Sequence, residues 1–87
     1  MEIVSYTHPT FWKCYRKLPK EIQELADKKF SLFLSNPFHP SLGFAQKGNV
    51  WTVDVGLHYR AIAWRENENV VWFWIGTHAA YNRIIGR

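Results

Sequence analysis

Two hydrophobic periodicities divide this chain. From residue 19 to 36, apolar residues recur at spacings of three and four, which is the repeat of one face of an α-helix. From residue 50 to 76, runs rich in Val, Ile, Trp, Tyr and Phe are separated by short segments that contain Gly or Asn, which is typical of β-strands. The pattern therefore predicts a long helix followed by an antiparallel meander.

The meander should contain three strands. We expect them at Val50–Val55, Tyr59–Arg65 and Val70–Gly76. The connecting segments, residues 56–58 and 66–69, are too short for a crossover, so consecutive strands must be antiparallel neighbours. This sheet is the element that the rest of the chain should cover.

Prolines divide the segment before the meander. Glu2–Thr7 contains three β-formers and predicts a short first strand. Pro9 and Pro19 suit the first turn of a helix, where a missing N–H costs nothing, so a helix should begin at each. The first helix should end near Lys17, and the second at Asn36, which precedes a proline. Residues 36–49 then form a connection that either crosses over simply or carries functional groups.

The apolar stripe of the long helix should pack against the sheet. Its members are Ile22, Leu25, Ala26, Phe30, Phe33 and Leu34. Leu32 lies off this stripe, which makes it a candidate contact for another chain.

Alternation along the strands sorts their side chains into two faces. We expect the helices to cover the face that holds Trp51, Val53, Val55, Ala61, Ala63, Val71, Phe73 and Ile75. The opposite face then holds Thr52, Asp54, Arg60, Ile62, Trp64, Trp72 and Trp74. Three tryptophans are poorly placed on a free surface. Either the connection and the C-terminal tail cover this face and Arg60 pairs with Asp54, or the face forms part of a binding groove.

Composition narrows the class of protein. At 87 residues, 47% hydrophobic and 17% aromatic, the chain suits one domain, residues 1–87. A net charge of +4 and a pI of about 9.5 favour a polyanionic partner. The lone Cys14 cannot form an internal disulfide and is expected to be a small packed residue.

No run approaches the roughly 20 apolar residues that span a bilayer, and the start lacks a secretory pattern, so we expect a cytoplasmic protein without membrane contact. The scattered histidines predict no metal, and no motif predicts a cofactor.

Three segments of the chain resemble the RelE/ParE superfamily of bacterial type II toxins. They read PFHPSL, WTVDVGLHYRAI and VVWFWIGTHAAY, and the likeness covers about residues 2–85. Its most specific parts are Tyr59-Arg60, which opens a strand, and the segment Ile75 to His78 followed by Tyr81. The resemblance implies an α+β fold with a short N-terminal strand and two helices packed on one face of an antiparallel sheet.

The resemblance also implies a function. RelE-type members are endoribonucleases that cleave mRNA in the ribosomal A site through attack of a 2′-OH on phosphate, without metal. ParE-type members target DNA gyrase, and both types are neutralised by a cognate antitoxin. We therefore expect a toxin of a plasmid-stabilising type of toxin–antitoxin system that binds RNA and inhibits translation, with the antitoxin, the ribosome and mRNA as partners. A catalytically degenerate binding module and a gyrase inhibitor are the alternatives.

Family positions can be matched to single residues. Arg60 matches the strand arginine that contacts the scissile phosphate, His78 the basic residue after the last strand, and Tyr81 the C-terminal tyrosine, so these three are the predicted catalytic residues. The predicted RNA-binding positions are Lys47, Thr52, Asp54 and Arg83. Two strand positions that hold lysines in RelE-type members correspond here to Thr52, which is neutral, and Asp54, which is acidic.

Overall fold

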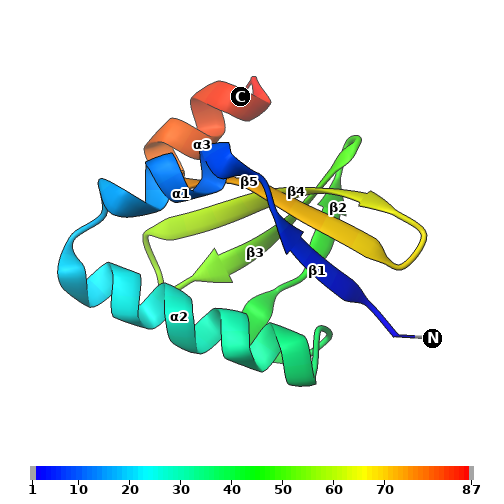
Figure 1. The fold of residues 1–87 in the computed structure, drawn as a ribbon. Helices are drawn as coiled ribbons and strands as arrows, with labels where there is room; N and C mark the ends of the chain where they lie inside the picture. Colours follow the sequence, from blue (N-terminus) through cyan, green and yellow to red (C-terminus); the bar gives the residue numbers. More distant parts are fainter. Residues whose placement is uncertain (1, 87) are drawn as a thin grey trace.

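The computed structural model describes residues 2–86 and has an α+β architecture. In chain order, the elements are β1 (Val4–Thr7), α1 (Pro9–Arg16), α2 (Lys20–Ser35), the 3-10 turn η1 (Pro40–Leu42), β2 (Ala45–Lys47), β3 (Val50–Val55), β4 (Tyr59–Glu66), β5 (Asn69–Thr77) and α3 (His78–Ile85). The helices α1 and α2 share one core with the sheet, whereas α3 lies against the other side of the sheet (Figure 1). Within the described residues, no helix is both long and apolar enough to cross a membrane.

The five strands form one sheet in the order β1-β5-β4-β3-β2. The three predicted strands of the meander are β3, β4 and β5, and they pair antiparallel as expected. The edge strand β1 pairs parallel to β5, because two helices separate it from the meander and provide the long connection that a parallel neighbour needs. Three elements were not predicted: η1 and β2, both within the segment expected to be irregular, and α3.

The two predicted helices are present, with small differences at their starts and ends. Pro9 is the first residue of α1, as the missing N–H predicts. Pro19 instead caps α2 in an extended conformation, so that helix begins at Lys20. Cys14 packs against the core as a partly buried residue.

A β-bulge in β5 changes which side chains face the helices. Ile62 of β4 lies opposite Trp74, whereas its neighbour Ala63 lies opposite Trp72. One residue of β5, Phe73, therefore has no partner of its own, and the alternation of faces shifts at that point.

The bulge makes three predicted face assignments wrong. Trp72 is 3% exposed and meets Phe33 of α2 edge-on at 5.2 Å between ring centroids, so it belongs to the helix-side core. Phe73 stacks on the half-exposed Trp64 at 4.0 Å, and Val71 lies opposite Trp64, so both are on the other face. Simple alternation cannot reveal an inserted residue, which reverses every assignment beyond it.

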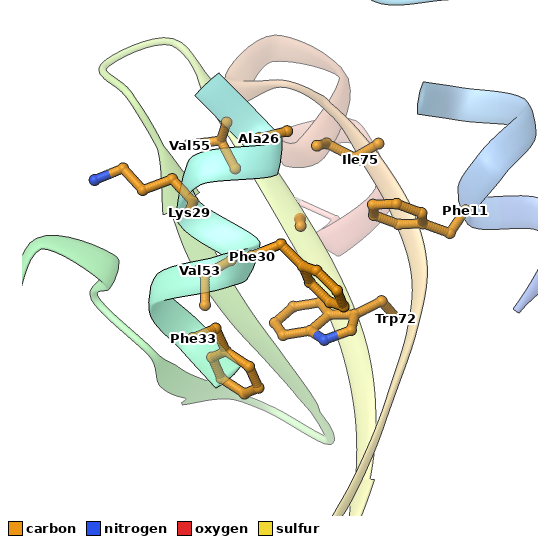
Figure 2. Close-up of a pocket in the computed structure, with 10 residues that line it drawn as sticks. Phe11, Ala26, Lys29, Phe30, Phe33, Val53, Val55, Trp72 and Ile75 are labelled. Atoms are coloured by element: carbon orange, nitrogen blue, oxygen red, sulfur yellow. The ribbon is translucent and has the colours of Figure 1, made fainter. Parts of the chain in front are cut away.

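The helix-side core is centred on Phe33. This side chain is 2% exposed and meets both Trp72 and Phe44 edge-on. Phe30, Phe33 and Trp72 line a gap between α2 and the sheet, which has a volume of about 30 Å³. Figure 2 shows these side chains together. Aromatic rings of both elements thus meet between the helix and the strands.

The end of α2 is rotated differently from the prediction. Leu32 packs against the core, whereas Leu34 is 58% exposed. Both lie one residue from the buried Phe33, about 100° around the helix on either side, so periodicity alone does not decide which of them is covered. The prediction that Leu32 is free for another chain was wrong.

The opposite face of the sheet is covered in part by α3. Beneath the helix, Thr52 and Ile62 are 2% and 0% exposed, and Tyr81 of α3 is 5% exposed. The connection after α2 contributes a close contact between Gly43 and the carboxylate of Asp54, while Leu42 and Phe44 join the helix-side core. The C-terminal segment provides the cover over Thr52 and Ile62.

The core predicts a large loss of stability on truncation of Phe33. Phe33→Ala should reduce the free energy of unfolding by about 3–5 kcal/mol, since it leaves a cavity between Phe44 and Trp72. Leu34→Ala, one residue away but exposed, should change it by no more than about 0.5 kcal/mol. Urea unfolding followed by tryptophan fluorescence measures both, and similar losses would contradict this placement of α2.

Candidate functional site

Arg60 lies at the start of β4, directly opposite Asp54 of β3. Its Nε donates a hydrogen bond to Oδ1 of Asp54 at 2.9 Å. The side chains are 23% and 40% exposed, so the pair is open to solvent and contributes little to stability. Its consequence for the site is that the carboxylate occupies one N–H donor of the guanidinium group.

Tyr81 holds the same guanidinium from the other side. Cζ of Arg60 lies 4.9 Å from the centroid of the Tyr81 ring, which is cation–π geometry. Tyr81 reaches this position because α3 begins immediately after β5. The hydroxyl group of Thr77 caps that start by accepting a hydrogen bond from N–H of Ala80 at 3.1 Å.

His78 is the first residue of α3. Its backbone N–H donates to the carbonyl of His58, in the turn between β3 and β4, at 2.9 Å. Its ring centroid lies 6.3 Å from that of Tyr81, with the ring planes at 56°. The three predicted catalytic residues, Arg60, His78 and Tyr81, thus form one continuous group of contacts.

The predicted RNA-binding residues do not gather in the same way. Thr52 is 2% exposed, so its side chain offers no surface to a nucleic acid in this conformation. Lys47 ends β2 beside the start of β3, four residues or roughly 13 Å along the strand from Asp54. Arg83 is exposed on α3. It follows Tyr81 by two residues, so it lies on another side of that helix. Only Asp54 contacts the group around Arg60.

Sequence reasoning gave no role to Gly76, which lies opposite Arg60. A Cβ at this position would lie 2.6 Å from Cζ2 of Trp74. The indole of Trp74 therefore lies over the glycine, beside the start of β4. A glycine in the interior of a predicted strand is a known sign of close approach by another group, and this signal was present in the sequence.

The sequence of the chain matches a known family over most of its length. The family model for the ParE-like toxin domain matches residues 20–83, which include α2, the whole meander and most of α3. The chain belongs to the ParE-like toxin domain family. The predicted membership of the RelE/ParE superfamily is confirmed. Among curated protein sequences, none is significantly similar to this ParE-like chain.

Solved structures confirm the predicted fold class. YafQ from E. coli superposes on this ParE-like domain with a TM-score of 0.69 and 15% identity, over 92% of this chain and 98% of YafQ. A chain of the RelB-RelE antitoxin-toxin complex from Methanococcus jannaschii gives a TM-score of 0.71 at 14% identity, over 91% and 96% of the two chains. A chain of the E. coli DinJ-YafQ toxin-antitoxin complex gives a TM-score of 0.69 at 15% identity, over 92% of this chain and 97% of the matched chain.

The ion pair predicts how the site responds to loss of its carboxylate. Asp54→Asn should strengthen binding of a short single-stranded RNA by up to about fivefold, because the carboxylate no longer competes with phosphate for Arg60. Glu24→Gln removes the same charge from an exposed position on α2 and should leave affinity unchanged. Fluorescence anisotropy at fixed salt measures both. Weaker binding by the Asp54 variant would show that the carboxylate orients Arg60 rather than competing with the ligand.

Proposed function

We propose that this chain is the toxin of a type II toxin–antitoxin system. It acts in the cytoplasm as a metal-independent endoribonuclease on mRNA bound to the ribosome, stops translation, and is neutralised by its own antitoxin. The contact between Arg60, Tyr81 and His78 on one surface of a RelE-like fold carries this proposal. Chains with this fold occur in complexes with antitoxins, among them RelB and DinJ, which supports a protein partner of that kind.

The proposed reaction is a transesterification within the RNA. The 2′-oxygen forms a bond to the adjacent phosphorus, the bond from phosphorus to the 5′-oxygen breaks, and a 2′,3′-cyclic phosphate and a 5′-OH result. One proton must leave the 2′-OH and one must reach the 5′-oxygen, while extra negative charge on the phosphoryl oxygens is stabilised. The overall change needs no redox partner and no co-reactant.

Arg60 suits stabilisation of that charge. A guanidinium has five N–H donors, and the hydrogen bond from Nε to Asp54 uses one of them. The four N–H bonds on the two Nη atoms remain for phosphate oxygens, which a planar fork can bind in pairs. Tyr81 acts as a positioning residue, since its ring holds the guanidinium in place for that contact.

His78 suits proton transfer. Imidazole changes its charge near neutral pH, so it can accept a proton from the 2′-OH or donate one to the 5′-oxygen. Its position next to Tyr81 places it within the same group as Arg60.

A second candidate function is a catalytically degenerate member that only binds. The observation that favours it is the carboxylate of Asp54 at 2.9 Å from Arg60, where RelE-type strands have a lysine. A carboxylate at that distance repels phosphate, so a chain of this kind would bind its antitoxin without cleaving RNA. A gyrase inhibitor is the third candidate, and it would cause DNA damage signalling with intact mRNA.

Loss of Arg60 decides between these functions. Wild-type chain expressed without an antitoxin should stop growth, and toe-printing on translating ribosomes should show cleaved mRNA. Arg60→Ala should slow cleavage by about 10²–10³-fold, as for loss of one electrostatic stabiliser, and restore growth. Lys28→Ala removes the same charge from exposed α2 and should keep full toxicity. A wild-type chain that leaves growth and mRNA intact would rule out the nuclease.

A proton-transfer role predicts a kinetic defect for His78→Gln. Cleavage should slow by about 10²–10⁴-fold, while binding to the ribosome persists because Arg60 is unchanged. Single-turnover cleavage and ribosome co-sedimentation separate the two effects. His58→Gln, in the turn that holds α3 through its backbone, is the matched control and should retain activity. Equal loss in both variants would indicate disturbed docking of α3 instead of chemistry.

A further inference from the structure

A groove lies between the α1–α2 connection and the start of α3. Lys17 and Pro19 belong to one side of it, and Thr77 and Ala80 to the other, while Trp74 contributes an aromatic surface. We call this the Trp74 groove. Its volume is about 320 Å³, within the range of about 300–1,000 Å³ that is typical of sites for small organic groups.

The indole N–H of Trp74 is available to a ligand. Within residues 2–86, Trp12 and Trp72 donate their indole N–H groups to Thr7 and Ser5 at 3.0 Å, but Trp74 makes no hydrogen bond of this kind. Every fully buried polar side-chain atom in the same residues has a partner, so this N–H is at least partly accessible to solvent. The groove therefore offers the aromatic surface of an indole whose N–H signal can report on binding.

Gly76 connects the groove to the site around Arg60. Arg60 and Gly76 are directly opposite on neighbouring strands, which places their α-carbons about 4.5–5.5 Å apart. The six-membered ring of Trp74 lies over this glycine, where a Cβ would meet Cζ2 and Cη2 at 2.6 and 2.8 Å. The missing side chain thus allows the indole to lie over the residue that is directly opposite Arg60.

We propose that the Trp74 groove binds the base of the nucleotide next to the phosphate held by Arg60. The base stacks on the face of the Trp74 indole, and Lys17 attracts the following phosphate. The position of the phosphate rests on the proposed function, whereas the stacking of the base does not. A single-stranded RNA is the occupant, because stacking needs an unpaired base and Lys17 favours a polyanion.

Indole N–H signals in nitrogen-15 NMR test the site directly. The probe is a short single-stranded RNA with 2′-O-methyl groups, which block attack by the 2′-oxygen, and Trp74→Phe identifies the signal. The Trp74 signal should shift on addition of the probe, while that of Trp64, half-exposed on the same face of the sheet, should not. The same backbone without bases should leave the Trp74 signal in place. A static Trp74 signal at millimolar probe overturns the proposal.

Affinity measurements add a second readout. Trp74→Ala should weaken binding of the probe by about 5- to 150-fold, which corresponds to loss of one stacked base, and should not alter binding of the base-free backbone. Gly76→Ala should give a similar loss although the indole is still present, because the new methyl group displaces the ring. Trp64→Ala is the control and should bind normally. An equal loss with Trp64→Ala would overturn a site at this groove.

The outcomes also separate this proposal from the nuclease proposal. If mRNA on ribosomes stays intact but the Trp74 signal shifts with bases and not with the base-free backbone, the nuclease proposal fails and the base site stands. A second outcome is that the wild-type chain cleaves mRNA, the Arg60→Ala variant does not, and the Trp74→Ala variant binds the RNA probe normally. In that case the base site fails and the nuclease proposal stands.

Discussion

One inserted residue in β5 determines how this small protein divides its aromatic side chains. Because Phe73 has no partner of its own on β4, Trp72 enters the core beneath α2, while Trp74 lies on the opposite face over Gly76. Without the bulge, the two faces of β5 would be exchanged beyond that residue. Trp72 and Trp74 would then lie on the same face, so either the core would lose the contact of Trp72 with Phe33 or the face that carries Arg60 would lose the indole of Trp74.

The group around Arg60 depends in turn on α3. That helix covers part of the second face of the sheet and supplies Tyr81 against the guanidinium and His78 beside Tyr81. Its start is held by a cap from Thr77 and by a backbone hydrogen bond to the turn at His58. The same short segment therefore completes the packing of the sheet and places two of the candidate catalytic side chains.

Membership of a toxin family and the chemistry of the site are separate conclusions. The family model and the solved structures establish the family and the fold, but folds of this kind support different activities through local changes in side chains. In this chain the local change is Asp54, which occupies one position on Arg60 that a phosphate could otherwise use. Within residues 2–86, the other four N–H bonds of the guanidinium have no hydrogen-bond partner, and the proposed activity depends on them.

The sequence by itself determined the elements whose signals are local: the apolar stripe of α2, the position of Pro9 and the three strands of the meander. The resemblance to a family singled out Arg60, His78 and Tyr81, and pairing of Arg60 with Asp54 was one of two open alternatives. Only the tertiary structure decided the bulge at Phe73, the cover provided by α3 and the contact between Trp74 and Gly76. These depend on register and on packing between distant segments, which side-chain alternation along one strand does not contain.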